Sequence, residues 1–248
     1  MASLAGFRSQ SVRIRGAGGS QDSIGTILLH RIGASENGAT VSARSLAAPK
    51  DARKAFERGR DLVKRNDLDG AVREFRKAVA LYPEYSTAWC ELGDIQFARG
   101  QLDAARGWFQ TTLHSDPAYV YPYVQLSRVE LKAARWQQLA AATGKTLALD
   151  SFAYPQVFLF DTVAHYHLGD YALAEQSISR AEPLDKRHEF PQIVYLKVLL
   201  LLQHQDYAGA AECLRAYLKL GPDSADAPKV REQLKDIEAH APHPPVNP

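Results

Sequence analysis

The chain has 248 residues, of which 46% are hydrophobic and 23% charged, a balance that is typical of a folded globular protein rather than a disordered one. The formal net charge is only +2, and basic and acidic residues nearly balance from residue 49 onward, so nucleic acid is not an expected partner. The apolar stretch Val198–Leu202 is far shorter than the roughly 20 residues that a membrane-spanning helix needs, so no membrane span is expected.

The two cysteines and the first ten residues bear on the compartment. Cys90 and Cys213 are too few and too far apart for a disulfide framework or a metal site, so both are expected to be buried thiols. Residues 1–10 lack the basic start and the apolar run of a secretory signal, which predicts a cytoplasmic protein. If the chain is an amino-terminally truncated form, a periplasmic or exported protein is expected instead.

Residues 1–48 differ in pattern from the rest of the chain. Short alternating runs at 11–15, 23–32 and 39–46 are typical of β-strands, and the glycine-rich stretch 16–20 is typical of a hairpin turn. From residue 49 the apolar residues change to helical spacing. The sequence therefore predicts a short β-rich arm followed by a helical domain over 49–240 and a disordered, proline-rich tail over 241–248.

An internal repeat runs through the helical part. A small residue, a Leu, an Ala, a large aromatic residue and a Pro recur at a separation of 34 residues: Gly59, Leu68, Ala71, Phe75 and Pro83 are followed by Gly93, Leu102, Ala105, Phe109 and Pro117. Trp89 and Leu92 recur at the same separation as Tyr123 and Leu126. Related patterns at 169–178 and 205–214 extend the repeat toward the carboxyl end.

These recurring residues and their period resemble the tetratricopeptide repeat. The resemblance implies an all-α, right-handed superhelical solenoid of about five helix hairpins, over 52–85, 86–119, 120–153, 155–189 and 191–223, with a cap helix over 224–240. Ser127 and Thr162 depart from the family's first-helix glycine, and Thr143 departs from its second-helix Phe. Gly93 and Ala105 are expected to let two helices approach closely, while Pro83 and Pro117 end the second helices.

The arm carries a second resemblance. The segments around 5–7, 11–14 and 23–33, leading into the first repeat, resemble the closing strands of a carboxypeptidase regulatory-like domain, which is joined to such repeats in exported bacterial proteins. This resemblance implies that residues 1–48 are the remnant of a larger domain.

Motifs that would indicate an enzyme are incomplete. The Gly144-Lys145-Thr146 triplet lacks the earlier glycine of a phosphate-binding loop and falls inside an expected helix. His165 and His167 are two residues apart, whereas helical zinc ligands are four apart. We therefore expect no catalytic residue, no metal and no cofactor.

The resemblance implies instead a binding groove lined by the first helix of each repeat. Its expected ligand-facing residues are Arg53, Phe56, Arg60, Asp94, Phe97, Tyr121, Arg128, Leu159, Tyr166 and Tyr195. Arg60 and Arg128 are expected to pair with acidic groups, and Tyr166 with Tyr195 to anchor an apolar segment. The lysine and asparagine pairs that clamp a terminal carboxylate in some members are missing, which disfavours a chaperone-tail receptor.

The predicted function is a non-enzymatic scaffold that binds a protein or peptide. Two alternatives stay open at this point: a self-assembling structural protein, which would form homo-oligomers, and the docking half of a larger exported protein. The identity of the partner does not follow from the repeat pattern, because one fold serves many functions.

Overall fold

The fold is described from a computed structural model, covering residues 7–9, 27–31, 40–150, 154, 156–184 and 191–240. The chain divides into two compact units, residues 1–157 and 158–248. In the first unit the elements are β1 Phe7–Ser9, β2 Ile27–Arg31, β3 Thr40–Val41, α1 Ala43–Leu46, α2 Lys50–Lys64, α3 Leu68–Leu81, α4 Ser86–Ala98, α5 Leu102–Ser115, α6 Val120–Lys132 and α7 Trp136–Leu149. The second unit contains most of α8 Gln156–Leu168, followed by α9 Tyr171–Ala181, a 3-10 turn Glu182–Leu184, α10 Pro191–Gln203, α11 Tyr207–Leu220 and α12 Ala227–His240.

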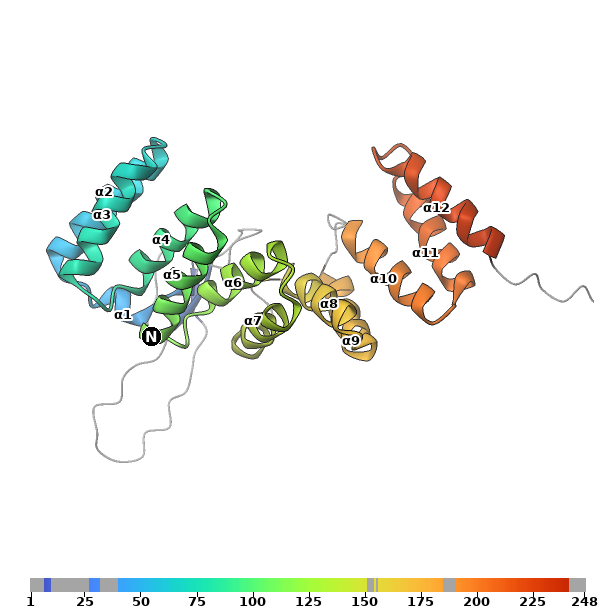
Figure 1. Cartoon of the computed structure of the whole chain (residues 1–248), viewed down its shortest axis with the longest axis horizontal. Coiled ribbons are helices and arrows are strands. Elements are labelled where there is room, and N and C mark those ends of the chain that lie inside the picture. The colour runs from blue at the N-terminus through green and yellow to red at the C-terminus, as the bar shows by residue number, and fades with distance from the viewer. Residues whose placement is uncertain are drawn as a thin grey trace, which may run out of the picture. The chain divides into compact units, whose positions relative to one another are not determined.

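Helices joined by short turns form pairs, and each predicted repeat contains one pair. In Figure 1, α2 lies alongside α3 and α4 alongside α5, and the helices of these pairs are in close contact. Each pair has one residue with a left-handed backbone in the turn between its helices, namely Asn66, Gly100, Ala134, Gly169 and Gln205. Their spacing of 34 to 36 residues confirms the predicted period at the level of the backbone.

The helix starts follow ordinary capping chemistry. Asp67 accepts a hydrogen bond from the Gly70 amide at 2.8 Å, and Asp206 does the same for Gly209 at 2.8 Å. In both cases the side chain satisfies an amide that has no partner within its own helix. The carboxylate lies where a Cβ on Gly70 or Gly209 would be, so the glycine leaves room for the cap.

Close approach of the two helices depends on the glycines of the repeat. A Cβ placed on Gly59 would lie 2.5 Å from Phe75 Cε1, and one placed on Gly93 would lie 2.5 Å from Phe109 Cε1. Both phenylalanines are fully buried. The aromatic ring of the second helix therefore occupies the volume that a first-helix side chain would need.

The third pair replaces both partners of this contact together. Ser127 and Thr143 stand in the places of the glycine and the phenylalanine, and both are fully buried. Their hydroxyls donate to carbonyl oxygens one turn earlier, Ser127 to Tyr123 at 2.9 Å and Thr143 to Leu139 at 3.1 Å. A larger first-helix residue is thus matched by a smaller second-helix residue, which explains the departures seen in the sequence.

The carboxyl-terminal helix closes the second unit as predicted. In α12, Val230 and Ile237 are buried and Leu234 packs against the same apolar cluster, which includes Ala210 and Leu214 of α11. The opposite face of α12 carries the exposed charged residues.

The amino-terminal arm is partly as expected. Antiparallel pairing joins β1 to β2 and β2 to β3, with Phe7 opposite Arg31 and Ile27 opposite Val41. Residues 42–46, however, were predicted as part of a strand and instead form a helical turn, because Ser42 accepts a hydrogen bond from the Ser45 amide and begins α1. The expected strand at 11–15, the turn at 16–20 and the tail at 241–248 lie outside the described residues.

Replacing Gly93 with Leu should destabilise the first unit by about 2–3 kcal/mol, because the new side chain collides with Phe109 in a closed interface. Urea unfolding followed by circular dichroism measures the change. The control is Gly107→Ala in α5, where a Cβ meets no atom within 4 Å, so this variant should be neutral or more stable by up to about 1 kcal/mol. Equal destabilisation by both variants would contradict the packing account.

Candidate functional site

The predicted binding face can be followed in the first unit along α2, α4 and α6, which are the first helices of their pairs. Asp94 on α4 is its centre. Its carboxylate accepts one hydrogen bond from the Tyr121 hydroxyl at 2.9 Å and another from the Gln125 amide. Burial raises the pKa of Asp94, while the hydrogen bonds from Gln125 and Tyr121 oppose that rise. Two first helices are therefore joined by a polar network, which we call the Asp94 network.

A cationic side chain continues this network on α6. Arg128 donates to Gln125 Oε1 at 3.0 Å, and its guanidinium lies 5.0 Å from the ring centre of Phe97. The ammonium of Lys132 lies 5.6 Å from the same ring. Both distances are within the range of a cation–π interaction. Arg128 is exposed, so it stays accessible while Phe97 and Gln125 fix its position.

A second carboxyl group lies beside the Asp94 network. Glu91 is one turn before Asp94 on α4, and its carboxylate is 4.0 Å from the Arg60 guanidinium on α2. Burial, and then the charge of Asp94, raise the pKa of Glu91 to about 7, while Arg60 acts in the opposite direction. Arg60 itself is 59% exposed, so water screens its attraction to Glu91.

The remaining predicted residues of α2 are divided between surface and core. Arg53 and Arg60 are exposed. Phe56 is 9% exposed, and its ring contacts those of Phe75 and Tyr85 at centroid distances of 5.5 and 5.0 Å. Phe56 therefore belongs to the core of the first pair in this structure.

In the second unit the three predicted residues differ in exposure. Leu159 is 8% exposed and so is buried. The Tyr166 hydroxyl accepts a hydrogen bond from Gln203 at 3.2 Å, and its ring contacts Tyr171. Tyr195 on α10 is 50% exposed, which makes it one of the most exposed large apolar residues of the described chain.

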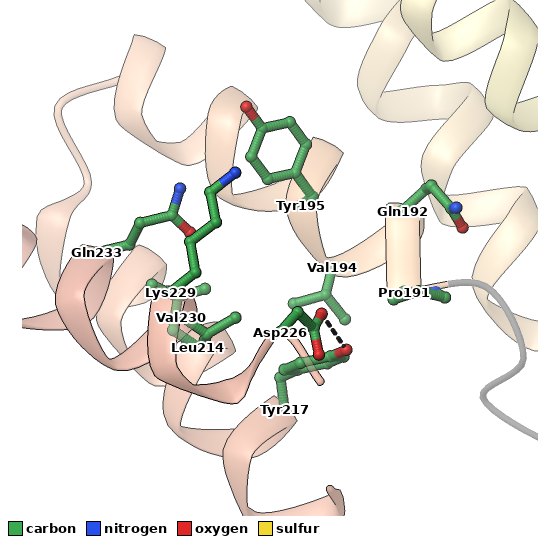
Figure 2. A pocket seen from close by; sticks show the side chains of 10 residues that line it. All are labelled: Pro191, Gln192, Val194, Tyr195, Leu214, Tyr217, Asp226, Lys229, Val230 and Gln233. Atoms are coloured by element: carbon green, nitrogen blue, oxygen red, sulfur yellow. Dashed lines mark hydrogen bonds between the residues drawn. The ribbon is translucent and has the colours of Figure 1, made fainter. Parts of the chain in front are cut away.

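Tyr195 lines a pocket of about 230 Å³ formed by helices α10, α11 and α12. Figure 2 shows the lining side chains, which are Pro191, Gln192, Val194, Tyr195, Leu214, Tyr217, Asp226, Lys229, Val230 and Gln233. Val194, Leu214 and Val230 supply apolar surface, whereas Gln192, Lys229 and Gln233 supply polar groups. The Tyr217 hydroxyl donates to Asp226 at 2.6 Å, and this hydrogen bond lowers the pKa of Asp226.

One cluster in the second unit has the residue types of a catalytic triad but not its order of contacts. Ser177 donates to Asp161 Oδ2 at 2.5 Å, and His165 Nε2 lies 3.8 Å from the other carboxylate oxygen. In a triad the serine bonds to the histidine, which acts as its base. Here the serine is bound to the carboxylate instead, so the arrangement does not activate a nucleophile.

Other chemistry considered from the sequence has no geometric support. Gly144, Lys145 and Thr146 lie within α7, and Thr146 donates to the Ala142 carbonyl oxygen at 3.0 Å, as a helical residue does. No group of three or more His, Cys, Asp or Glu side chains within the described ranges is arranged to hold a metal ion. Of the thiols, Cys90 is buried, whereas Cys213 is half-buried and not fully buried as expected.

Several residues of these surfaces were not predicted. Gln125 takes part in the Asp94 network and Glu91 lies beside it, and the polar side chains of both on first helices were the available signal. Lys229 and Gln233 come from α12, which the sequence indicated only as a cover for the last pair.

The architecture of paired helices places the chain among helical-repeat proteins, and the comparisons define the kind of repeat. The family model described as "Tetratricopeptide repeat" matches residues 50–120 and 195–227. The matched residues, which make up less than half of the chain, are thus similar to tetratricopeptide repeats. The match begins after the amino-terminal arm, so it does not show the resemblance of the arm to a carboxypeptidase regulatory-like domain. Most of the residues that carry this resemblance lie outside the described part of the chain.

Solved structures share this fold at low sequence identity. A tetratricopeptide repeat protein from Parabacteroides merdae ATCC 43184 is 14% identical, with a TM-score of 0.67 over 77% of this chain and 75% of that one. YrrB, a TPR protein with an unusual peptide-binding site, is 16% identical, with a TM-score of 0.65 over 77% of this chain and 98% of YrrB.

A curated protein matches part of the chain. Human protein O-mannosyl-transferase TMTC1 is 30% identical over 84 residues, which is 34% of this chain and 10% of TMTC1. The chain therefore spans a small part of that relative's length. Among the helices described for this chain, none has both the length and the apolar character that crossing a bilayer requires.

The raised pKa of Glu91 predicts a specific pH dependence of stability. Below about pH 4.5 the carboxyl group is protonated in the folded and the unfolded state, and above about pH 7 it is ionised in both. In between, the folded state binds more protons, so stability falls as the pH rises, and the cost of burying the charge is fully present above pH 7. Glu91→Gln should therefore stabilise the chain by about 1–3 kcal/mol at pH 8 and by much less at pH 4.5.

Urea unfolding of both proteins across this pH range measures the difference. The exposed Glu57→Gln, which removes the same charge from α2, is the control and should show no such trend. A stability gain from Glu91→Gln that is equal at pH 4.5 and pH 8 would contradict the assignment.

Proposed function

We propose that this chain is a non-enzymatic scaffold that binds a peptide or a protein segment through the exposed side chains of its first helices. The observation that carries the proposal is the pocket at α10, α11 and α12, where the half-exposed Tyr195 borders apolar side chains. A volume of about 230 Å³ suits one large apolar side chain. Aromatic residues beside such pockets commonly contribute much of the binding energy.

The first unit offers a surface of different chemistry. Arg53 and Arg60 are exposed on α2, and Arg128 is held on α6 by Phe97 and Gln125. An arginine whose position is already fixed loses less conformational entropy when it pairs with a carboxylate. The ligand proposed for this face is accordingly a segment that carries acidic side chains.

The fold supports a binding role because its stability and its surface depend on different residues. Gly59, Phe75, Gly93 and Phe109 hold the helix pairs together, while Arg60, Arg128 and Tyr195 are exposed. YrrB, which shares the fold, is a protein with a peptide-binding site. For the compartment, we keep the prediction made from the sequence: cytoplasmic, or periplasmic or exported if the chain is a truncated form.

Charge reversal on the first helices tests this proposal. A peptide library is first screened against the full chain, and the dissociation constants of the selected peptides are then measured by fluorescence anisotropy. Arg60→Glu together with Arg128→Glu should weaken an acidic peptide by about tenfold or more, which corresponds to about 1.4 kcal/mol, with unchanged helical content. Tyr195→Ala should weaken peptides that carry a large apolar residue by a similar factor.

The matched control reverses two exposed charges on the second helix of the first pair. Arg73→Glu with Arg76→Glu changes the net charge of the chain by the same amount on α3, and it should leave every affinity unaltered. If both double variants weaken the acidic peptide equally, the effect is one of net charge and the assigned face is wrong. If no peptide binds and the mass rises with protein concentration, self-assembly is the function instead.

A further inference from the structure

The last residues of the amino-terminal arm are packed into the repeat domain. Ser42 is fully buried, Ser45 is 8% exposed and Ala48 is 4% exposed. Ala48 belongs to the apolar core of the first two helix pairs, together with Ala52 and Tyr85. The packed structure therefore begins upstream of residue 49, where the sequence predicted the boundary. We call residues 42–48 the arm clasp.

The arm clasp supplies a missing helix cap. Helix α4 begins at Ser86, and the residue before it, Tyr85, makes no side-chain capping bond. The Thr87 amide lies in the first turn of α4 and so has no acceptor within its own helix. Ser45 Oγ accepts this amide at 3.0 Å and the Thr87 hydroxyl at 2.7 Å, so a residue 42 positions earlier caps α4.

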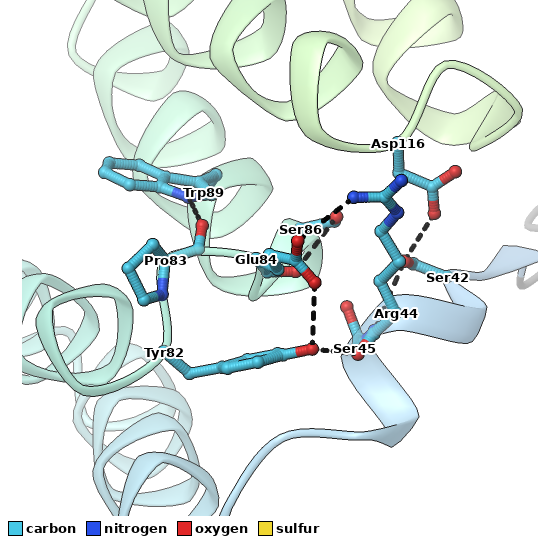
Figure 3. A network of polar contacts seen from close by, with 9 residues as sticks. All are labelled: Ser42, Arg44, Ser45, Tyr82, Pro83, Glu84, Ser86, Trp89 and Asp116. Atoms are coloured by element: carbon cyan, nitrogen blue, oxygen red, sulfur yellow. Dashed lines mark hydrogen bonds and ion pairs between the residues drawn. The ribbon is translucent and has the colours of Figure 1, made fainter.

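Three further contacts fix the clasp, and all of them are made by residues that precede Ser45. Ser42 donates to Asp116 Oδ2 at 2.6 Å, in the connection between α5 and α6. The Tyr82 hydroxyl lies 3.2 Å from the Arg44 carbonyl oxygen, and the Arg44 guanidinium lies 3.4 Å from Glu84. Figure 3 shows these side chains around the helical turn that contains Ser42 and Ser45.

The buried polar contacts of the clasp are made by hydroxyl groups. Ser42 and Ser45 are three residues apart on one helical turn, and the Ser42 hydroxyl also accepts the Ser45 amide at 3.3 Å, which holds the turn together. The Arg44 side chain is 48% exposed and Leu46 is 60% exposed, so both extend largely into solvent. The polar part of the recognition therefore depends on the two serines and the backbone carbonyl between them.

We propose that Tyr82, Thr87 and Asp116 form a binding site for a Ser-x-x-Ser helical turn, and that the chain fills this site with its own residues 42–45. Thr87, Glu91 and Asp94 lie four and three residues apart on α4 and so share one face of that helix. The occupied site covers the beginning of this face. A peptide that binds along α4 meets the clasp first and must displace it or stop at Glu91.

Amide hydrogen exchange of the full chain tests the site without any external partner. Ser42→Ala with Ser45→Ala should raise the exchange rate of the Thr87 amide by about fivefold to tenfold, since each lost hydrogen bond is worth roughly a fivefold change in the opening equilibrium. Tyr82→Phe, which removes only a hydroxyl, should raise the exchange rates of the amides of residues 45–48. The control is Ser179→Ala, which removes a hydroxyl that donates to the Glu175 carbonyl oxygen of its own helix, and it should change neither.

A peptide added to the double-serine variant tests recognition itself. The synthetic peptide TVSARSLAAP, which has the sequence of residues 40–49, should restore the protection of Thr87 and shift the backbone resonances of Thr87 and Asp116. The same peptide with both serines replaced by alanine should do neither. Unchanged Thr87 exchange in the double variant, or equal protection by the two peptides, would overturn the proposal. Because this test concerns only the clasp, its failure leaves the scaffold proposal standing, and failure of the peptide screen leaves the clasp standing.

Discussion

The contact between a first-helix glycine and a second-helix aromatic ring determines how closely the helices of a pair approach. In the first two pairs the ring of Phe75 or Phe109 fills the volume next to Gly59 or Gly93, at a distance that no Cβ could tolerate. Because interiors are densely packed, the position of the ring fixes the position of both helices. In these two pairs, the side chains that α2 and α4 expose are therefore placed by this buried contact.

The proposed binding surfaces are formed by residues that do not take part in this contact. The Asp94 network joins α4 to α6 through hydrogen bonds, and Arg128 is oriented by Gln125 and the Phe97 ring. The pocket beside Tyr195 uses α12, which has the place of a further first helix but covers the core with Val230 and Ile237. The first unit thus carries a polar face and the second an apolar pocket.

Repetition made most of the fold predictable from the sequence. Glycine, alanine and an aromatic residue recur at fixed separations because each pair solves the same packing problem, so the helix pairs could be placed from residues such as Gly93 and Phe109 alone. The arm clasp could not, because the bond between Ser42 and Asp116 joins residues 74 positions apart. The helical turn that Ser42 begins by accepting the Ser45 amide was likewise expected to be a strand. Phe56 has the helical spacing of the exposed Arg53 and Arg60 and was therefore predicted to face a ligand. Instead its ring packs against those of Phe75 and Tyr85 in the core.

A double-mutant cycle at the second pair tests the central contact most directly. Gly93→Ser, Phe109→Thr and the two substitutions together reproduce in α4 and α5 the combination that Ser127 and Thr143 form in the third pair. The free energy of unfolding of the four proteins, measured in urea, gives the coupling between the two positions. The account predicts that the double variant is more stable than the sum of the single losses by at least about 1 kcal/mol, because the smaller side chain makes room for the larger one. Losses that add within about 0.5 kcal/mol would show that the two positions are independent and would contradict it.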